Sequence, residues 1–134
     1  MTFLVDTSVW SLALRRDTPP DMPEIAALRR ALVGGEDIAS TGFILAELLC
    51  GRIPPAVQAK IRHYFGYIDI LQPSTDEYIA AAELINNCRG SGIQLTLVDA
   101  VIASLAISRD LTLLTTDRDF HHVSSLEPLR LWAA

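Results

Sequence analysis

The chain has little of what marks secreted or membrane-spanning proteins. It holds two cysteines, Cys50 and Cys88, which form neither a CxxC motif nor a disulfide framework. We therefore expect the reduced, buried thiols of a cytoplasmic protein. The first residues lack a basic segment followed by a long apolar one, so no signal peptide is expected. The longest apolar stretch, residues 95–107, is interrupted by polar side chains and is too short to span a bilayer.

An excess of basic residues is also absent. The chain has 11 Lys and Arg residues against 16 Asp and Glu residues, a formal net charge of -5. This balance argues against indiscriminate attachment to nucleic acid or to an anionic membrane, although it is compatible with a local basic groove. The chain also lacks a GxSxG motif, a P-loop and a reactive cysteine with an evident histidine partner. Catalysis through a nucleophilic side chain is therefore not indicated.

The composition that remains is that of a folded globular protein. Half of the residues are hydrophobic and 20% are charged, which argues against disorder. The length suits one domain, and no internal repeat, low-complexity tract or linker divides it. We expect residues 1–134 to form a single domain.

Short apolar segments alternate with helical patterns along this domain. Strands are predicted at Phe3–Val5, Ile38–Ala39, Tyr67–Leu71, Leu111–Leu114 and, at an edge, Leu129–Trp132. Helices are predicted at Val9–Leu14, Pro23–Val33, from Ser40 or Thr41 to Gly51, at Ala56–Tyr64, from Ser74 or Thr75 toward Cys88, and at Thr96–Ile107, with a helical turn at Asp119–His122. This alternation predicts an α/β fold in three α/β/α layers around a short, mainly parallel central sheet.

Four carboxylates lie within the apolar segments or at their ends: Asp6, Glu47, Asp99 and Asp117. A buried carboxylate is costly unless a partner neutralises it, and no matching set of lysines or arginines lies beside these four. In a parallel α/β sheet the ligand crevice lies outside the carboxyl ends of the strands, where all four can converge. Oxygen ligands suit Mg²⁺ or Mn²⁺, so the set indicates one or two divalent metal ions.

Each acid also has a purely structural explanation when it is taken alone. Asp6 could cap the helix that follows it, and Asp99 could be the acid of a capping box. Glu47 could be a half-exposed helix residue, while Asp117 and Asp119 could belong to turns. The prediction of a metal site therefore rests on the whole set. Its natural chemistry is phosphodiester hydrolysis by metal-activated water.

Four segments resemble, in order, the motifs of PIN-domain proteins. They are VDTSVW at residues 5–10, AELLCG at 46–51, LVDAVIA at 97–103 and LTTDRDF at 114–120. Each motif is weak alone, but four in this order and spacing are specific. With the total length, they resemble the small bacterial VapC-type toxins over the whole chain.

This resemblance implies a PIN-like fold and a metal-dependent endoribonuclease, with Mg²⁺ or Mn²⁺ as cofactor, that acts as the toxin of a toxin–antitoxin pair. By position, it implies that the catalytic and metal-binding residues are Asp6, Glu47, Asp99 and Asp117. Hydroxyls that orient water or these carboxylates would come from Thr7, Ser8, Thr115 and Thr116. Asp119 would either support the metal through water or belong only to the turn before Phe120.

The resemblance also implies partners: an RNA substrate, a VapB-type antitoxin and a second copy of the chain in a homodimer. RNA contacts are predicted for Arg15, Arg16, Arg89 and Arg118, through the phosphate backbone. For any one of these arginines, ordinary solvated surface charge remains the alternative.

Two other function classes share part of this pattern. Metal-dependent phosphatases and receiver-like domains also place acids at strand ends. The phosphatase pattern needs a second aspartate where this chain has Ser8, and the receiver pattern needs a late lysine, whereas the only lysine is Lys60. A binding module that keeps the fold without catalysis is the other class, and the intact acids argue against it. Metal-dependent RNA cleavage with an EDTA control would separate it from an enzyme.

Overall fold

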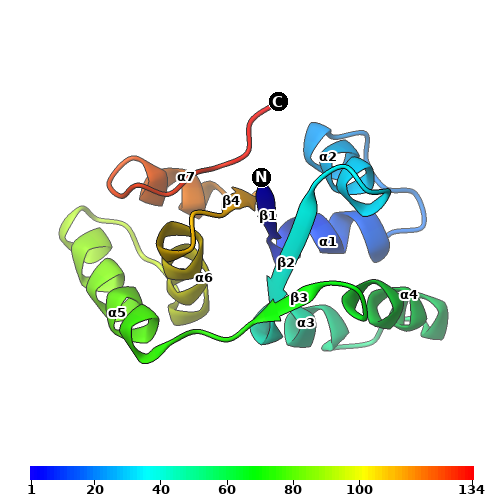
Figure 1. Ribbon diagram of the computed structural model, residues 1–134, viewed down its shortest axis with the longest axis horizontal. Helices are drawn as coiled ribbons and strands as arrows, with labels where there is room; N and C mark the ends of the chain where they lie inside the picture. Colours follow the sequence, from blue (N-terminus) through cyan, green and yellow to red (C-terminus); the bar gives the residue numbers. More distant parts are fainter.

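The computed structural model describes all 134 residues and confirms the three-layer α/β fold (Figure 1). Four parallel strands pair in the order β3-β2-β1-β4: β1 (Thr2–Val5), β2 (Asp37–Thr41), β3 (Asp69–Leu71) and β4 (Thr112–Leu114). The helices are α1 (Thr7–Leu14), α2 (Pro23–Leu32), α3 (Gly42–Leu49), α4 (Pro55–Phe65), α5 (Thr75–Gly90), α6 (Leu97–Ser108) and α7 (Arg118–Ser124).

The direction of the strand connections explains how the helices form two layers. From β1 to β2 and on to β3 the chain steps one way across the sheet, through α1 to α4. From β3 to β4 it returns past β2 and β1, through α5 and α6. Because parallel crossovers are right-handed, the two sets of helices must cover opposite faces. In Figure 1, α1 to α4 lie to the right of the sheet, and α5 and α6 lie to its left.

The core sits on both sides of the short sheet. Its strands are not amphipathic: Leu4 and Val5 of β1, and Leu113 and Leu114 of β4, are all fully buried. This pattern is typical of parallel strands covered on both faces. Helix α6 is buried along Ala100–Ala106 and packs against both α5 and β4. An acid in its first turn is therefore held close to the sheet.

The predicted edge strand at Leu129–Trp132 is wrong. Only Leu131 forms an isolated parallel bridge, with Leu113 of β4. The Leu113 N–H donates to the carbonyl of Arg130, and its carbonyl accepts from the Trp132 N–H, both at 2.9 Å. Because β4 has three residues and alternate residues bond to opposite sides, only its middle residue faces outward. The pairing therefore cannot extend.

Smaller differences concern the ends of helices. The helical turn predicted at Asp119–His122 is a helix of seven residues, α7. Helix α5 continues to Gly90, and the start left open between Ser40 and Thr41 is resolved by the Thr41 hydroxyl, which accepts from the N–H of Ile44 at 3.2 Å. None of the helices combines the length and the apolar character that a membrane crossing requires.

Candidate metal centre at the carboxyl edge of the sheet

The strand order creates a crevice at one end of the sheet. Strands β1 and β4 are neighbours, although the helices next to them in the chain lie on opposite faces. Such a reversal of direction is where parallel α/β proteins bind ligands, outside the carboxyl ends of the strands. Asp6 follows directly after β1, and the segment Thr115–Asp117 follows directly after β4. The fold therefore brings both predicted acids to the same edge.

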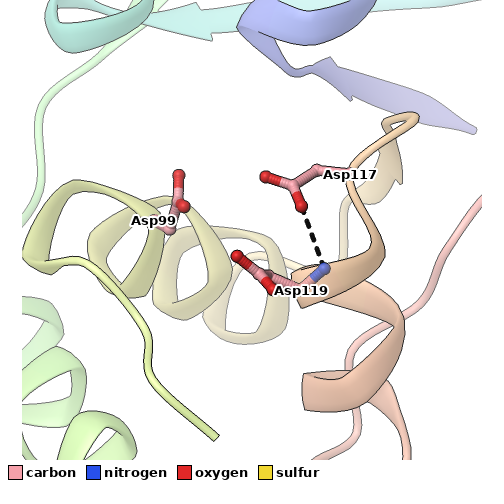
Figure 2. Close-up of side chains that lie close together, drawn as sticks. All are labelled: Asp99, Asp117 and Asp119. Atoms are coloured by element: carbon pink, nitrogen blue, oxygen red, sulfur yellow. Dashed lines mark hydrogen bonds between the residues drawn. The ribbon is translucent and has the colours of Figure 1, made fainter.

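Three carboxylates converge there. Asp99, Asp117 and Asp119 each offer an oxygen, and these oxygens lie within 4.8 Å of one another. Figure 2 shows the side chains pointing toward one another, Asp99 from the first turn of α6 and the two others from the start of α7. All three are partly buried. Three carboxylate oxygens at this spacing could together hold a cation.

Local capping fixes two members of this cluster. One carboxylate oxygen of Asp117, Oδ1, accepts a hydrogen bond from the N–H of Asp119 at 2.9 Å, so it caps α7 and leaves Oδ2 free (Figure 2). The hydroxyl of Thr96 accepts from the N–H of Asp99 at 3.1 Å and caps α6. The structural role of Asp117 is therefore real and orients its carboxylate, whereas Thr96 caps α6 through the backbone N–H of Asp99, and the Asp99 carboxylate does not close a capping box.

Asp6 behaves differently from a capping residue. It occupies the N-cap position of α1, but its carboxylate makes no capping hydrogen bond. Instead its Oδ2 accepts from the hydroxyls of Ser8 and Thr115, both at 2.8 Å, and Oδ1 has no hydrogen-bond partner. The side chain is only 6% exposed. The purely structural explanation of Asp6 as a helix cap is thus not what holds this side chain.

The two hydroxyls link the ends of β1 and β4. The Ser8 hydroxyl also accepts from the N–H of Thr116 at 3.1 Å, and the Thr115 hydroxyl accepts from the N–H of Asp117 at 3.0 Å. Each hydroxyl thus accepts from the backbone and gives its proton to Asp6. One network therefore holds Asp6 and the backbone that carries Asp117 in a fixed relation.

Glu47 is the exposed member of the acidic set. It lies on α3, and its Oε1 accepts from the hydroxyl of Thr7 at 3.2 Å. Its charge acts on Asp99, as do the charges of Asp6 and Asp117. All four acids predicted from the sequence therefore face one region.

The electrostatics of this region favour a cation. Burial, followed by the charge of Asp6 and by smaller effects of Asp117 and Glu47, raises the pKa of Asp99 to about 6, against the opposing hydrogen bond with Thr96. The ion pairs of the molecule involve none of these acids. Like charges held together without a basic partner are unfavourable. The donor set consists entirely of carboxylate oxygens, so the residues fit a hard divalent ion such as Mg²⁺ or Mn²⁺.

The remaining predicted residues are placed as follows. Thr116 contributes its backbone N–H to the network, and its hydroxyl makes no hydrogen bond within the chain. Arg15, Arg16, Arg89 and Arg118 are exposed and form no ion pair. The sequence left the role of Asp119 open, whereas its carboxylate lies among the three that converge. In the sequence, this role is indicated by the position of Asp119 two residues after Asp117, in the segment that follows a buried strand.

A family model described as the PIN domain matches residues 3–126. Comparison with curated protein sequences gave no match.

Solved structures share the fold at low identity. VapBC2 from Rickettsia felis, bound to a DNA fragment from its promoter, is 22% identical with a TM-score of 0.76, covering 99% of this chain and 100% of its own. VapBC-1 from nontypeable Haemophilus influenzae is 17% identical with a TM-score of 0.73, covering 98% and 97%. VapC20 from Mycobacterium tuberculosis, a sarcin–ricin loop cleaving toxin, is 19% identical with a TM-score of 0.64, covering 96% and 98%.

Proposed function

The chain belongs to the PIN-domain family, and from that premise we propose that it is a metal-dependent endoribonuclease, the toxin of a toxin–antitoxin pair. The observation that carries the proposal is the convergence of Asp99, Asp117 and Asp119, with Asp6 and Glu47 acting on the same carboxylate. An all-oxygen, negatively charged site at the carboxyl edge of a parallel sheet suits metal-assisted hydrolysis of a phosphodiester.

The structures of similar fold support the biological setting of the proposal. VapC20 is a toxin that cleaves the sarcin–ricin loop, and the Rickettsia and Haemophilus structures are VapBC assemblies. We therefore propose RNA as the substrate, a VapB-type antitoxin as the partner, and a homodimer as the assembled toxin. Residues 1–134 would act as one catalytic domain.

Asp6, Glu47, Asp99 and Asp117 are the proposed catalytic acids, and Asp119 joins them as a proposed ligand. When bound, Mg²⁺ or Mn²⁺ would lower the pKa of a coordinated water and stabilise charge on the phosphate. The Ser8 and Thr115 hydroxyls donate to Oδ2 of Asp6, which leaves Oδ1 without a partner in the chain and available to a metal ion. The Thr7 hydroxyl orients Glu47 at the exposed side of the site.

The test is cleavage of end-labelled RNA by the purified chain with Mg²⁺, with Mn²⁺ and with EDTA. We expect internal cuts that require the metal and disappear in the Asp99→Asn variant. The same preparation should release no inorganic phosphate from phosphomonoesters, which separates a nuclease from a phosphatase. RNA that is bound but never cut under any metal would instead support a non-catalytic binding module and refute the proposal.

A further inference from the structure

The loop between α5 and α6, residues 91–96, is a preformed wall beside the acidic site. Its first half is tied back to α5, because the N–H of Ile93 donates to the carbonyl of Cys88 at 2.8 Å and that of Gly92 to Arg89 at 3.1 Å. Gly92 has a φ of +77°, a left-handed conformation that permits this tight return. Its second half is anchored by buried Leu95. Gln94 therefore sits, exposed, between two fixed neighbours.

Two surface hollows meet at Gln94. The Gln94 hollow, of about 600 Å³, is lined by Gly92, Ile93, Gln94, Asp119, His122 and Ser125. The Arg89 hollow, of about 500 Å³, is lined by Ile85, Arg89, Ile93, Gln94, Leu95 and Thr96. The first borders the acidic cluster through Asp119, and the second borders it through Thr96, whose hydroxyl caps the helix that carries Asp99. The two hollows therefore adjoin each other at Ile93 and Gln94, beside the acids.

The lining of the Gln94 hollow suits a base better than a phosphate. It holds neither lysine nor arginine that could pair with a phosphate. The Gln94 amide can both donate and accept, and neither it nor the His122 ring has a hydrogen-bond partner within the chain. Ser125 donates its hydroxyl proton to the carbonyl of His122 at 2.6 Å, so its oxygen remains an acceptor. Ile93 adds an apolar surface.

The Arg89 hollow has the opposite character. Arg89 is exposed, forms no ion pair and is the only charged residue in the lining. A guanidinium that is free of carboxylate partners is a ready contact for a phosphate. The two hollows therefore differ in character: the Gln94 hollow has hydrogen-bonding groups and neither lysine nor arginine, and the Arg89 hollow has one free cation.

We propose that Gln94 sets the sequence preference of cleavage by hydrogen-bonding the edge of one unstacked base next to the scissile phosphate. Arg89 then contacts a phosphate further along the same strand. Because the Watson–Crick edge of a base is accessible to such a hollow only when the base is unpaired, the substrate is a single-stranded or looped RNA segment. This inference rests on the proposed function, whose catalytic acids it uses as the point where the strand is cut.

The experiment maps cut sites in a randomised single-stranded RNA pool for the wild type and for three variants: Gln94→Ala, Arg89→Ala and Gln58→Ala. Gln58 lies on α4, in the other helix layer, and is the matched control. We expect Gln94→Ala to reduce the preference at one nucleotide beside the cut by about tenfold, the discrimination that one good base contact supplies. Arg89→Ala should lower cutting of all sequences about equally and weaken its salt dependence. Gln58→Ala should match the wild type.

A second readout does not depend on cleavage. In the Asp99→Asn background, fluorescence anisotropy compares binding of labelled RNAs that differ at that one nucleotide. A wild-type pattern of cut sites and of binding in Gln94→Ala, with an unchanged unfolding midpoint, would overturn the inference. If the chain cut no RNA but bound it with a preference that Gln94→Ala removes, the nuclease proposal would fail while the base contact stood. Gln94→Glu, which keeps the size and removes the amide donor, should also alter the preference.

Discussion

Carboxylates are buried or partly buried in two regions of this molecule, and the charges that surround them are opposite in sign. Glu77, near the start of α5, is 5% exposed and is fully paired. Arg109 donates to its two oxygens at 2.7 and 3.0 Å, and the N–H of Ser74 donates at 2.9 Å. At the carboxyl edge of the sheet, Asp99 is instead surrounded by other acids.

The pKa values separate the two regions. The hydrogen bond from Arg109, outweighing the opposing effect of burial, lowers the pKa of Glu77 to about 2. Burial and neighbouring acids raise the pKa of Asp99 to about 6. A carboxylate whose partners all come from the chain stabilises the fold. One whose neighbours repel it is stabilised by a partner from outside the chain, and this difference is the physical basis for the proposed site.

The largest expected effect is on catalysis at the unpaired acids. Asp99→Asn should reduce RNA cleavage by roughly 1,000-fold, since several kcal/mol of charge stabilisation would depend on the metal that Asp99 is proposed to hold. Unfolding in urea with EDTA should show no loss of stability, because the substitution removes repulsion. Asp76→Asn, in the first turn of α5, removes a comparable helix-terminal charge and should leave cleavage unchanged. Near wild-type RNA cleavage by Asp99→Asn would show that the unpaired acids are not needed for catalysis, and the two regions would then not differ in role.

A smaller catalytic effect is expected from the hydroxyls that hold Asp6. Ser8→Ala and Thr115→Val should each lower kcat for RNA cleavage by about 10- to 100-fold, because Asp6 loses one of its two donors while remaining in place. Ser11→Ala, one turn further along α1, is the control and should have no effect on kcat. Full activity in both hydroxyl variants would mean that Asp6 is positioned by packing alone.

The paired region should respond in stability and not in catalysis. Glu77→Gln leaves partly buried Arg109 without its carboxylate, so the free energy of unfolding should fall by about 2 kcal/mol. The measurement is urea unfolding at neutral pH, beside RNA cleavage under the same conditions. Glu83→Gln, exposed on the same helix, is the control for both measurements. If Glu77→Gln cost activity and not stability, the assignment of the two regions would be reversed.

The weakest test uses pH on the metal-free protein. The pKa of Asp99 in the folded protein is about 6, above its ordinary value of 3.8, so its unfavourable contribution is present above pH 6 and disappears as the pH falls toward 3.8. The pKa of Glu77 in the folded protein is about 2, below its ordinary value of 4.5, so its stabilising contribution is present above pH 4.5 and is lost as the pH falls through 2.

Stability measured with EDTA should therefore rise by about 1 kcal/mol from pH 7 to pH 5, after allowance for solvent screening, and fall below pH 4.5. Asp99→Asn should abolish the rise, and Glu77→Gln should flatten the fall. Saturating Mg²⁺ should also remove the rise, since a bound cation offsets the repulsion at pH 7. A rise that persists in Asp99→Asn would assign it to another group.

The convergence of the acids at the edge of the sheet could largely be predicted from the sequence, whereas the pairing of Glu77 with Arg109 could not. Asp6 and Asp117 follow buried strands, and parallel strands end at a common edge, so their convergence could be predicted. Glu77 and Arg109 are 32 residues apart and carry no local signature of pairing. Their contact depends on how α5 packs against the end of α6, which only the tertiary structure determines.

Two other outcomes have local physical reasons. The apolar pattern of Leu129–Trp132 predicts a strand, but the outward hydrogen-bonding groups of a three-residue β4 are exhausted after one residue. Asp119 could not be ranked from the sequence, because a residue in the first turn of a helix can face either solvent or a neighbour. The packing of α7 beside α6 turns it toward Asp99 (Figure 2).

The network that joins Ser8 to Thr115 spans 107 residues of the chain. The Asp117 and Asp119 carboxylates reach Asp99 only when β4 has paired with β1 and Thr115 has met Asp6. Under the proposed function, a chain in which β4 has not docked would therefore lack two of its five acids and would not cut RNA.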